Sequence, residues 1–349
     1  MAVYALMRRR AIAFALLSAA LFGASTPLAK LLLGSTSPLL LAGLLYLGAG
    51  IGLAAWLALR RGFQPIARSD LPWLGAAVIT GGIAGPALLM FGLARTDGAT
   101  ASLLLNLEAV FTAVIAWVAF RENVDRRVFA GMAAIVAGGV ILSFETIPAS
   151  ESFKGQIFIA AACLAWALDN NLTRRISGGD AATLACIKGL VAGSVNLGLA
   201  LAQGAYLPAP GFIAIAGLVG LLGYGVSLAL FIVALRDLGT ARTAAYFSVA
   251  PFFGAALALL LLAETPGAAF WVASALMALG VWLHISERHG HAHAHEPLAH
   301  QHEHVHDEHH RHEHPFPWDG KEPHVHPHEH DALSHTHRHH PDLHHRHRH

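Results

Sequence analysis

Ionisable side chains are rare between residues 11 and 285, and Glu108 is one of the few that lie in the middle of a long apolar segment. Asn106 precedes it by two residues. Burial in a bilayer favours the neutral, protonated form of a carboxyl group. Glu108 could therefore alternate between holding a proton and holding a solute. It could equally be the structural partner of a buried cation, and the sequence leaves both interpretations open.

A second polar group is formed by Lys188 and the run Asp-Asn-Asn at 169–171. Lys188 lies inside the apolar segment 181–203, about 10 Å along a helix axis from its start. Its ammonium group could bind an anionic part of a solute or neutralise a carboxylate, and a structural ion pair with Asp169 is predicted. Asn196, two turns further along, would extend a polar stripe on the same helix.

Tyr46, Tyr224 and Tyr246 could supply hydroxyl groups to a cavity between membrane helices, and Tyr224 and Tyr246 are included in the predicted site for this reason. The predicted site for a solute or coupling ion consists of Glu108, Asn106, Asp169, Asn170, Asn171, Lys188, Asn196, Tyr224 and Tyr246.

Histidines are concentrated at the end of the chain, where 289–349 holds 24 of the 25. Most alternate with another residue, and Asp, Glu and Pro are interleaved. Neutral imidazole binds zinc, nickel, cobalt and copper, so this tail is predicted to bind a divalent metal. The absence of cysteine there argues against a closed zinc finger. We expect 286–349 to be disordered. The predicted metal ligands are His291, His293, His295, His302, His304, His306, His324, His326, His328 and His330.

Long apolar segments must position these polar residues. The chain of 349 residues is 55% hydrophobic and 13% charged, whereas soluble domains carry about 25% charged residues. A helix needs about 20 mainly apolar residues to cross a bilayer. We therefore predict an all-α membrane protein of ten transmembrane helices, at 11–33, 38–59, 71–93, 99–120, 127–144, 155–173, 181–203, 211–235, 240–263 and 266–285.

The two halves of the chain resemble each other. FGASTPLAK at 22–30 corresponds to WALDNNLTR at 166–174, and GLARTDGATAS at 92–102 corresponds to VALRDLGTART at 233–243. The predicted organisation is a five-helix repeat at 11–144, a second at 155–285 and the tail at 286–349. Since five spans are an odd number, the repeats must be inverted relative to each other. Such repeats are typical of secondary transporters, with the substrate site at the repeat interface.

Glycines interrupt the third and eighth spans at matched positions, TGGIAGP at 80–86 and LLGYGVS at 221–227. Matched glycine or proline interruptions in two halves indicate a binding cavity. Close packing of helices is the alternative, because small residues allow helices to approach.

Lysine and arginine occur mainly in alternate connections, which predicts cytoplasmic N- and C-termini. The arginines on that side are Arg8, Arg9, Arg10, Arg60, Arg61, Arg68, Arg121, Arg126, Arg127, Arg174, Arg175, Arg236 and Arg242, against Arg95 and Lys154 on the other. The three N-terminal arginines and the apolar run after them also imitate a cleaved leader. The apolar run has a counterpart in the second half of the chain, which favours a first membrane span over a cleaved leader.

GASTPLAK in the first span, LNLEAVFTAVIAWVAFRE in the fourth and LGTARTAAYFSVAPFFGAAL at 238–257 resemble the EamA type of the drug/metabolite transporter superfamily. The resemblance covers 11–285. It implies a ten-helix inner-membrane carrier of small organic solutes, without identifying the solute. Ala109 departs from the pattern, which usually has a proline after Leu-Glu, whereas Pro251 keeps the proline of the second repeat.

Three functions are compatible with these features. The first is a carrier of a small organic metabolite or drug-like solute, possibly coupled to protons. The second is a nickel, cobalt or zinc exporter with the tail as its metal-binding arm. The third is a membrane-anchored metal store or sensor. The expected partners are the lipid bilayer, a small molecule and metal ions on the tail, with a homodimer possible. No cofactor, nucleic acid or enzymatic reaction is expected, because the sequence has no nucleophile–base pair and no nucleotide loop.

Overall fold

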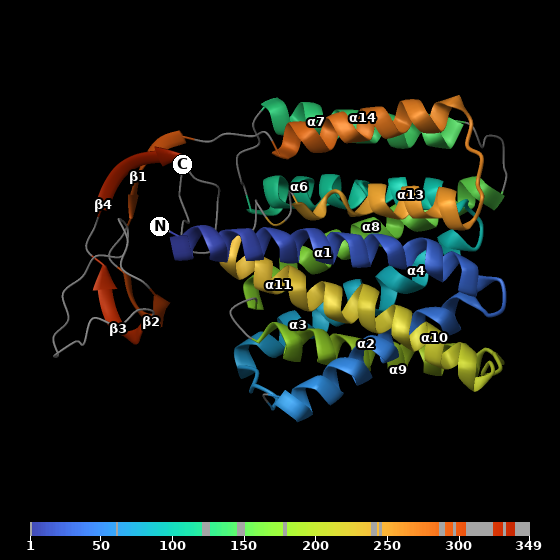
Figure 1. Ribbon diagram of the computed structural model, residues 1–349, viewed down its shortest axis with the longest axis horizontal. Coiled ribbons are helices and arrows are strands. Elements are labelled where there is room, and N and C mark those ends of the chain that lie inside the picture. The colour runs from blue at the N-terminus through green and yellow to red at the C-terminus, as the bar shows by residue number, and fades with distance from the viewer. Residues whose placement is uncertain are drawn as a thin grey trace. The chain divides into compact units, whose positions relative to one another are not determined.

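The computed structural model describes residues 2–60, 62–120, 126–144, 151–176, 180–238, 243, 246–285, 290–295, 298–304, 324–330 and 333–338. The chain divides into two compact units, Met1–Glu287 and Arg288–His349. The first unit is helical (Figure 1). Its α-helices are α1 (Ala2–Leu33), α2 (Pro38–Arg60), α3 (Leu71–Ala77), α4 (Gly85–Leu93), α5 (Gly98–Leu104), α6 (Leu107–Phe120), α7 (Arg126–Phe144), α8 (Glu151–Ile176), α9 (Ala181–Ala202), α10 (Pro210–Gly220), α11 (Ser227–Leu238), α13 (Ala250–Leu261) and α14 (Ala268–Ile285), with a 3₁₀ turn η1 (Arg68–Asp70) and π-helices η2 (Val78–Ala84) and η3 (Leu221–Val226).

These helices correspond to the ten predicted spans and confirm the all-α fold. Among the described residues, seven helical stretches are long and apolar enough to cross a membrane, and two shorter apolar helices lie at 250–261 and 268–283. The sixth predicted span is α8, which contains the polar run 169–171. The first span is longer than predicted, because α1 already begins at Ala2.

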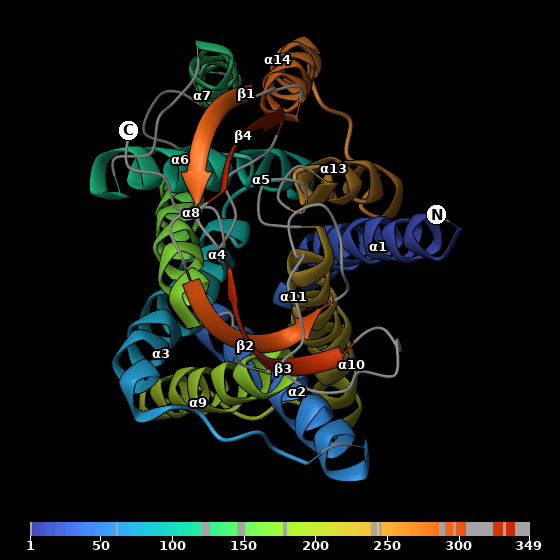
Figure 2. The same cartoon turned by 90° about the vertical axis from the view of Figure 1, so that its left-hand side faces the viewer.

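Helices of one half pack mainly against helices of the other. α2 lies along α9, α7 along α14, and α5 along α13. α1 contacts α11 and α13, while α8 contacts α4 and α6. Figures 1 and 2 both show α7 beside α14 and α2 beside α9. The two halves are thus interleaved, because these packed pairs join helices of different halves.

Small residues allow these close approaches. A Cβ on Gly48 of α2 would collide with Gly217 of α10, and a Cβ on Gly280 of α14 would lie 2.6 Å from the carbonyl oxygen of Gly131 on α7. Helices in a membrane associate by such close packing, because lipid supplies no hydrophobic drive between them.

The predicted glycine interruptions are real. The third and eighth spans both change from α- to π-helix at these positions, at η2 and η3. π-Helical turns are rare and often lie at functional sites. The fourth and ninth spans, predicted as continuous, are also interrupted, by turns at 105–106 and 248–249.

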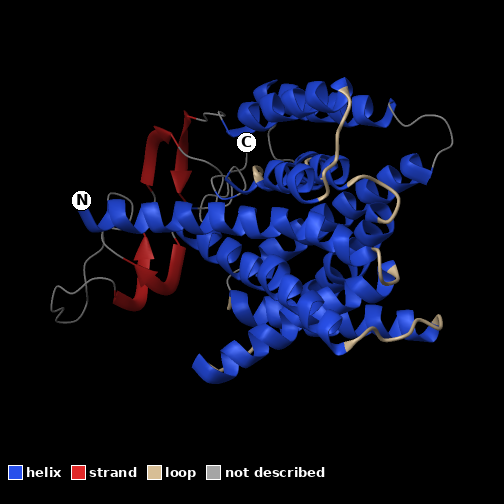
Figure 3. Ribbon diagram, turned by 45° about the vertical axis from the view of Figure 1, so that its right-hand side comes forward, coloured by secondary structure: helices blue, strands red, loops and turns tan. Residues whose placement is uncertain are grey.

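The second unit differs from the predicted disorder, because part of it forms strands. β1 (Gly290–His295) pairs with β4 (Leu333–Arg338), and β2 (Leu298–His304) pairs with β3 (His324–His330), both antiparallel. Figure 3 shows these strands in red. Alternation of histidine with another residue has the period of a β-strand, and this pattern explains why extended pairing replaces disorder in these segments.

Candidate polar site between the two halves

The predicted ion pair between Asp169 and Lys188 is confirmed. Lys188 Nζ lies 2.6 Å from both carboxylate oxygens of Asp169. Both residues are buried, with 6% of Lys188 and 7% of Asp169 exposed. Thr173, one turn after Asp169 on α8, donates its hydroxyl to the same carboxylate at 2.8 Å. The charge of Lys188 is therefore matched inside the protein rather than available to a solute.

The π-helix η2 leaves one backbone carbonyl without a donor from its own helix, next to this ion pair. The carbonyl oxygen of Gly81 lacks a helical donor, because Gly85 N–H bonds to the residue before Gly81 and Pro86 has no N–H. The Tyr46 hydroxyl and the Trp166 indole N–H donate to this oxygen at 3.1 and 2.9 Å. Side chains from α2 and α8 thus stabilise the irregular segment.

Gly81 also makes room for the carboxylate. A Cβ at Gly81 would collide with the side chain of Asp169, so only glycine lets α8 approach η2 this closely. Gly81 and Trp166 are absent from the residues predicted from sequence. The glycine pair in TGGIAGP was the signal that could have identified Gly81.

The predicted asparagines other than Asn170 satisfy backbone carbonyls. Asn196 of α9 donates to Ile83 of η2 at 3.2 Å. Asn171 and Asn106 donate to carbonyls four and three residues earlier in the chain, at 2.8 and 2.9 Å. Asn106 lies in the turn between α5 and α6, where its side-chain amide and its backbone N–H both donate to the Leu103 carbonyl.

Glu108 lies in the first turn of α6 and contacts Asn170 of α8. The Asn170 amide donates to Glu108 Oε1 at 2.7 Å. Glu108 is half-buried and Asn170 is exposed. A helix N-terminus favours a carboxylate, and the turn at 105–106 creates that N-terminus in the middle of a span. Among the described side chains, no cation contacts Glu108.

Aromatic rings gather where the halves meet. Phe22 and Trp166 occupy matched positions in FGASTPLAK and WALDNNLTR, and their rings meet edge to face at 6.0 Å. The ring centroid of Phe22 also lies 5.9 Å from that of Tyr224 in η3 and 5.4 Å from that of Phe247. The centroids of Tyr224 and Tyr46 are 5.2 Å apart. We call Phe22, Tyr46, Trp166, Tyr224 and Phe247 the aromatic cluster.

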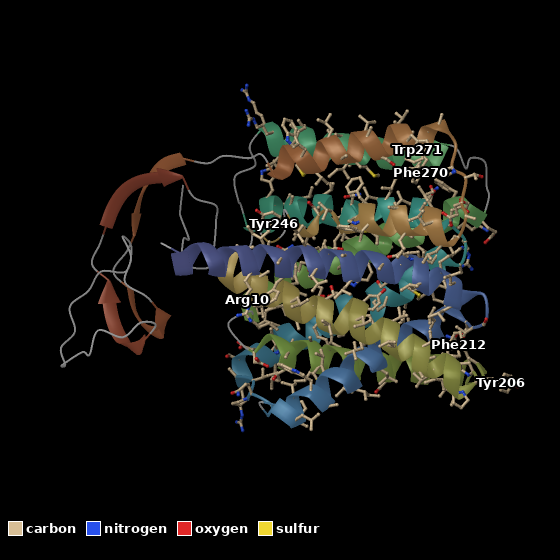
Figure 4. The ribbon with its side chains drawn as sticks, in the orientation of Figure 1. Arg10, Tyr206, Phe212, Tyr246, Phe270 and Trp271 are labelled. Carbon is tan, nitrogen blue, oxygen red and sulfur yellow. The ribbon has the colours of Figure 1, made fainter. Side chains whose placement is uncertain are left out.

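The two predicted tyrosines occupy different places. Tyr224 is part of the aromatic cluster, and its buried hydroxyl has no hydrogen-bond partner among the described residues. Tyr246 packs instead against an apolar group that includes Ala11 and Ala15 of α1 and Ala234 of α11. Figure 4 labels Tyr246 near the beginning of α1. The structure thus brings Tyr224 to the site and leaves Tyr246 outside the aromatic cluster.

Two charged residues cap half-helices at the end of the bundle near 94–97. Lys30 Nζ donates to the carbonyls of Leu93 and Thr96 at 2.6 and 2.9 Å, where α4 ends. The carboxylate of Glu264 accepts from Gly98 and Ala99 N–H at 2.7 and 2.8 Å, where α5 begins. A positive ammonium group at the end of α4 and a negative carboxylate at the beginning of α5 are each favoured by the helix dipole. Glu264 also joins the second half of the chain to α5.

The predicted metal ligands lie in the second unit, where the structure describes the strands. The register places His300 opposite His328, His302 opposite His326, and His304 opposite His324. His306 lies outside the described residues. Among the side chains that the structure describes, no group of three or more His, Cys, Asp or Glu could hold a metal ion.

Known proteins share both the sequence pattern and the fold. The profile of the EamA-like transporter family matches residues 9–144 and 153–286. An uncharacterized transporter of Methanothermobacter thermautotrophicus is 28% identical over 281 residues, covering 75% of this chain and 82% of that protein. A crystal structure superposes with a TM-score of 0.58 at 18% identity, covering 81% of this chain and 96% of the other. At that identity the superposition shows a shared fold.

Proposed function

Because the chain belongs to the EamA-like transporter family, we propose that it moves a small organic solute across the membrane by alternating access, in exchange for protons. The observation that carries the proposal is Glu108, a half-buried carboxyl group whose described partner is the neutral amide of Asn170. Asp169 is unsuited to this task, because Lys188 already binds both its oxygens.

Exchange of solute for protons follows if Glu108 can hold either a proton or the solute, but not both at once. Protonation removes the negative charge of Glu108, so a solute that needs that charge cannot stay bound. Release of the proton restores the charge. The Asn170 amide can donate to the carboxyl group in both forms, so it would hold the side chain in place through the cycle. The π-helices η2 and η3 supply irregular segments in each half, which suits rocking of one half against the other.

The proposal is tested with the purified full-length protein in liposomes that contain a pH-sensitive dye. A panel of small organic solutes is added outside, and solute-dependent proton flux is recorded. We expect flux with the native protein and none with Glu108→Gln. Glu151→Gln, which removes an exposed carboxylate at the beginning of α8, is the matched control and should behave like the native protein. Undiminished proton flux in Glu108→Gln would contradict the proposal.

We further propose that the protein lies in the cytoplasmic membrane with both termini in the cytoplasm. The bias of lysine and arginine toward alternate connections supports this orientation. Single cysteines added at Gly204 and Ala67, in connections on opposite sides, give the test. A membrane-impermeant thiol reagent applied to intact cells should label only the cysteine at position 204. Labelling of the cysteine at position 67 alone would show the opposite orientation and contradict the proposal.

For the second unit we propose binding of a divalent metal such as nickel, cobalt, zinc or copper. The facing histidines of β2 and β3 support this, because their register repeats at every second residue. Isothermal titration with nickel should show sites in the full-length protein that are lost on deletion of 288–349. Equal nickel binding by both proteins would exclude the tail as the ligand. Proton flux should survive the deletion if the tail serves metal binding alone.

A further inference from the structure

We infer that Lys30 and Glu264 form a latch that holds one end of the helical bundle shut and is released when the bundle opens at that end. Both side chains bind the same short stretch, 93–99, which connects α4 to α5. The inference rests on the proposed function for alternating access, and it adds the residues that close one end. The word latch is used below for these contacts of Lys30 and Glu264 with 93–99.

The first step is the chemistry of the bonds. Lys30 on α1 donates to two carbonyl groups of this connection, and Glu264 after α13 accepts from two N–H groups, all at 2.6–2.9 Å. Hydrogen bonds to an ionised group are stronger than neutral ones. The Lys30 ammonium also interacts electrostatically with Glu264 and Asp97. Because Lys30 belongs to the first half and Glu264 to the second, the latch ties the two halves together at this end.

The second step is that water can replace these bonds. Lys30 and Glu264 are half-buried, and their partners are backbone groups at the ends of helices. When this end opens, water reaches both the side chains and the backbone groups, so release leaves no charge unpaired inside the protein. Asp169 and Lys188 differ, because both are buried and their separation would leave two charges without a partner. Opening is therefore assigned to the latch and a permanent bond to the buried pair.

The third step is the packing that the latch holds together. A Cβ at Gly98 of α5 would lie 2.6 Å from Cδ1 of Leu262, beside Glu264. One turn further along α5, Ser102 Oγ would lie 2.9 Å from a Cβ at Gly254 of α13. Dispersion contacts weaken steeply with separation. They close the crossing of α5 and α13 only while the helices are held together, and the latch provides that hold at the end of the crossing.

A strained residue next to the latch favours its release. Ala263 has a φ of 50°, in the left-handed region that residues other than glycine rarely adopt. It lies between the end of α13 and Glu264, so this conformation turns the chain just before the carboxylate that binds α5. Strain of this kind persists only where surrounding contacts hold it. The bonds of Glu264 are such contacts, and opening of the latch would relieve the strain.

The experiment measures opening at this end as the reactivity of a thiol at position 102. Ser102→Cys changes one atom at a fully buried position of the α5–α13 crossing. Purified full-length protein in lipid nanodiscs is treated with a water-soluble maleimide, and labelling of each cysteine is followed by mass spectrometry of its peptide. Native Cys186, buried near the beginning of α9, is the internal control. α8 begins where Glu151 contacts Arg95 and ends just before α9, so Cys186 reports on the opposite end of the bundle.

The latch variants are made in the Ser102→Cys background. Glu264→Ala should speed labelling at position 102 by about tenfold, which corresponds to the loss of one charge-assisted hydrogen bond, and Lys30→Met should act in the same direction. Glu264→Gln, which keeps one acceptor oxygen, should have a smaller effect and guards against a folding defect of the alanine variant. Ala263→Gly should slow labelling, because glycine removes the strain. Glu151→Gln removes an exposed carboxylate that contacts the same connection, and it should leave the rate unchanged.

Unchanged labelling at position 102 in both Glu264→Ala and Lys30→Met would overturn the inference, as would faster labelling in Ala263→Gly. Equal acceleration at positions 102 and 186 would also overturn it, because it would show general loosening of the bundle rather than opening at one end. No solute and no pH gradient takes part in this experiment. Its failure therefore leaves the exchange of solute for protons standing, whereas undiminished proton flux in Glu108→Gln leaves the latch standing.

Discussion

The two π-helices pack against corresponding residues of opposite halves, but the contacts differ in chemistry. Gly81 of η2 lies against Asp169 of α8, and Gly223 of η3 lies against Ser25 of α1. Asp169 and Ser25 are matched positions in the repeat. On the η2 side the polar residue is a carboxylate paired with Lys188, whereas on the η3 side Ser25 donates to the Phe22 carbonyl within its own helix at 2.6 Å.

This difference distinguishes the features that both halves share from those that only one half has. Glycine, the π-helix and the close crossing occur in both halves, so they belong to the duplicated scaffold. The charges occur on one side only, together with Asn170 and its bond to Glu108. On the other side, the hydroxyls of Ser18 and Ser227 join α1 to α11 without charge. The buried charges at these two crossings therefore lie on α8 and α9.

The largest expected effect comes from breaking the charged side. Lys188→Met leaves Asp169 buried and unpaired, and we expect a loss of about 3–5 kcal/mol of stability. Thermal unfolding in detergent measures it. Asp169→Asn combined with Lys188→Met should recover most of the loss, because no buried charge remains. Tyr224→Phe on the neutral side removes a buried hydroxyl that has no hydrogen-bond partner among the described residues, so it should not lower the stability. Equal losses in the single and double variants would contradict the pairing.

Filling the glycine contacts tests the shared scaffold. Gly81→Ala places a Cβ against the Asp169 carboxylate and should cost about 1–3 kcal/mol through overpacking. Gly223→Ala, whose Cβ would lie 2.5 Å from Ser25 Cβ, should cost less, because no ion pair is displaced. Gly198→Ala is the matched control, since nothing lies within 4 Å of its Cβ. If Gly81→Ala unfolds at the same temperature as Gly198→Ala, the close crossing is not what holds Asp169.

The neutral side can be tested through its hydroxyl pair. Ser18 donates to the Ser227 carbonyl at 2.7 Å, and Ser227 donates to the Ser18 carbonyl at 3.0 Å, both buried. Ser18→Ala should cost about 1 kcal/mol, the usual net value of one hydrogen bond. Ser274→Ala, which removes the hydroxyl bond to the Phe270 carbonyl within α14, is the control. A loss as large as that of Lys188→Met would remove the contrast between the two sides.

The smallest effect is expected at Glu151, outside both regions. Lys154 and Arg95 contact this exposed carboxylate and lower its pKa. A lowered pKa contributes stability above the ordinary carboxyl value, and the contribution is lost as pH falls through the lowered value. The difference in melting temperature between native protein and Glu151→Gln should therefore be small at neutral pH and vanish in acid. A difference that grows on acidification would contradict this sign.

Much of the scaffold could be predicted from sequence, because span length, glycine positions and the repeat are local patterns. The Asp169–Lys188 pair was predictable as well, since two opposite charges in neighbouring apolar spans need partners. The bond between Asn170 and Glu108 was not, because it depends on how α6 and α8 cross. The bonds of Tyr46 and Trp166 to the Gly81 carbonyl depend on a change of helix type that periodicity does not reveal. The strands of the second unit were not predicted, because the tail has almost no apolar periodicity from which strands are usually recognised.

The hydroxyl pair of Ser18 and Ser227 joins residues 209 positions apart. When the ribosome has completed the first five spans, the partners of α1 on α11 and α13 do not yet exist. α5 likewise lacks its cap until Glu264 has been made. The newly inserted first half must therefore keep surfaces open to lipid until the second half arrives and intercalates. Assembly of the bundle is consequently a late event in biosynthesis, and truncation in the last spans should affect helices made at the beginning.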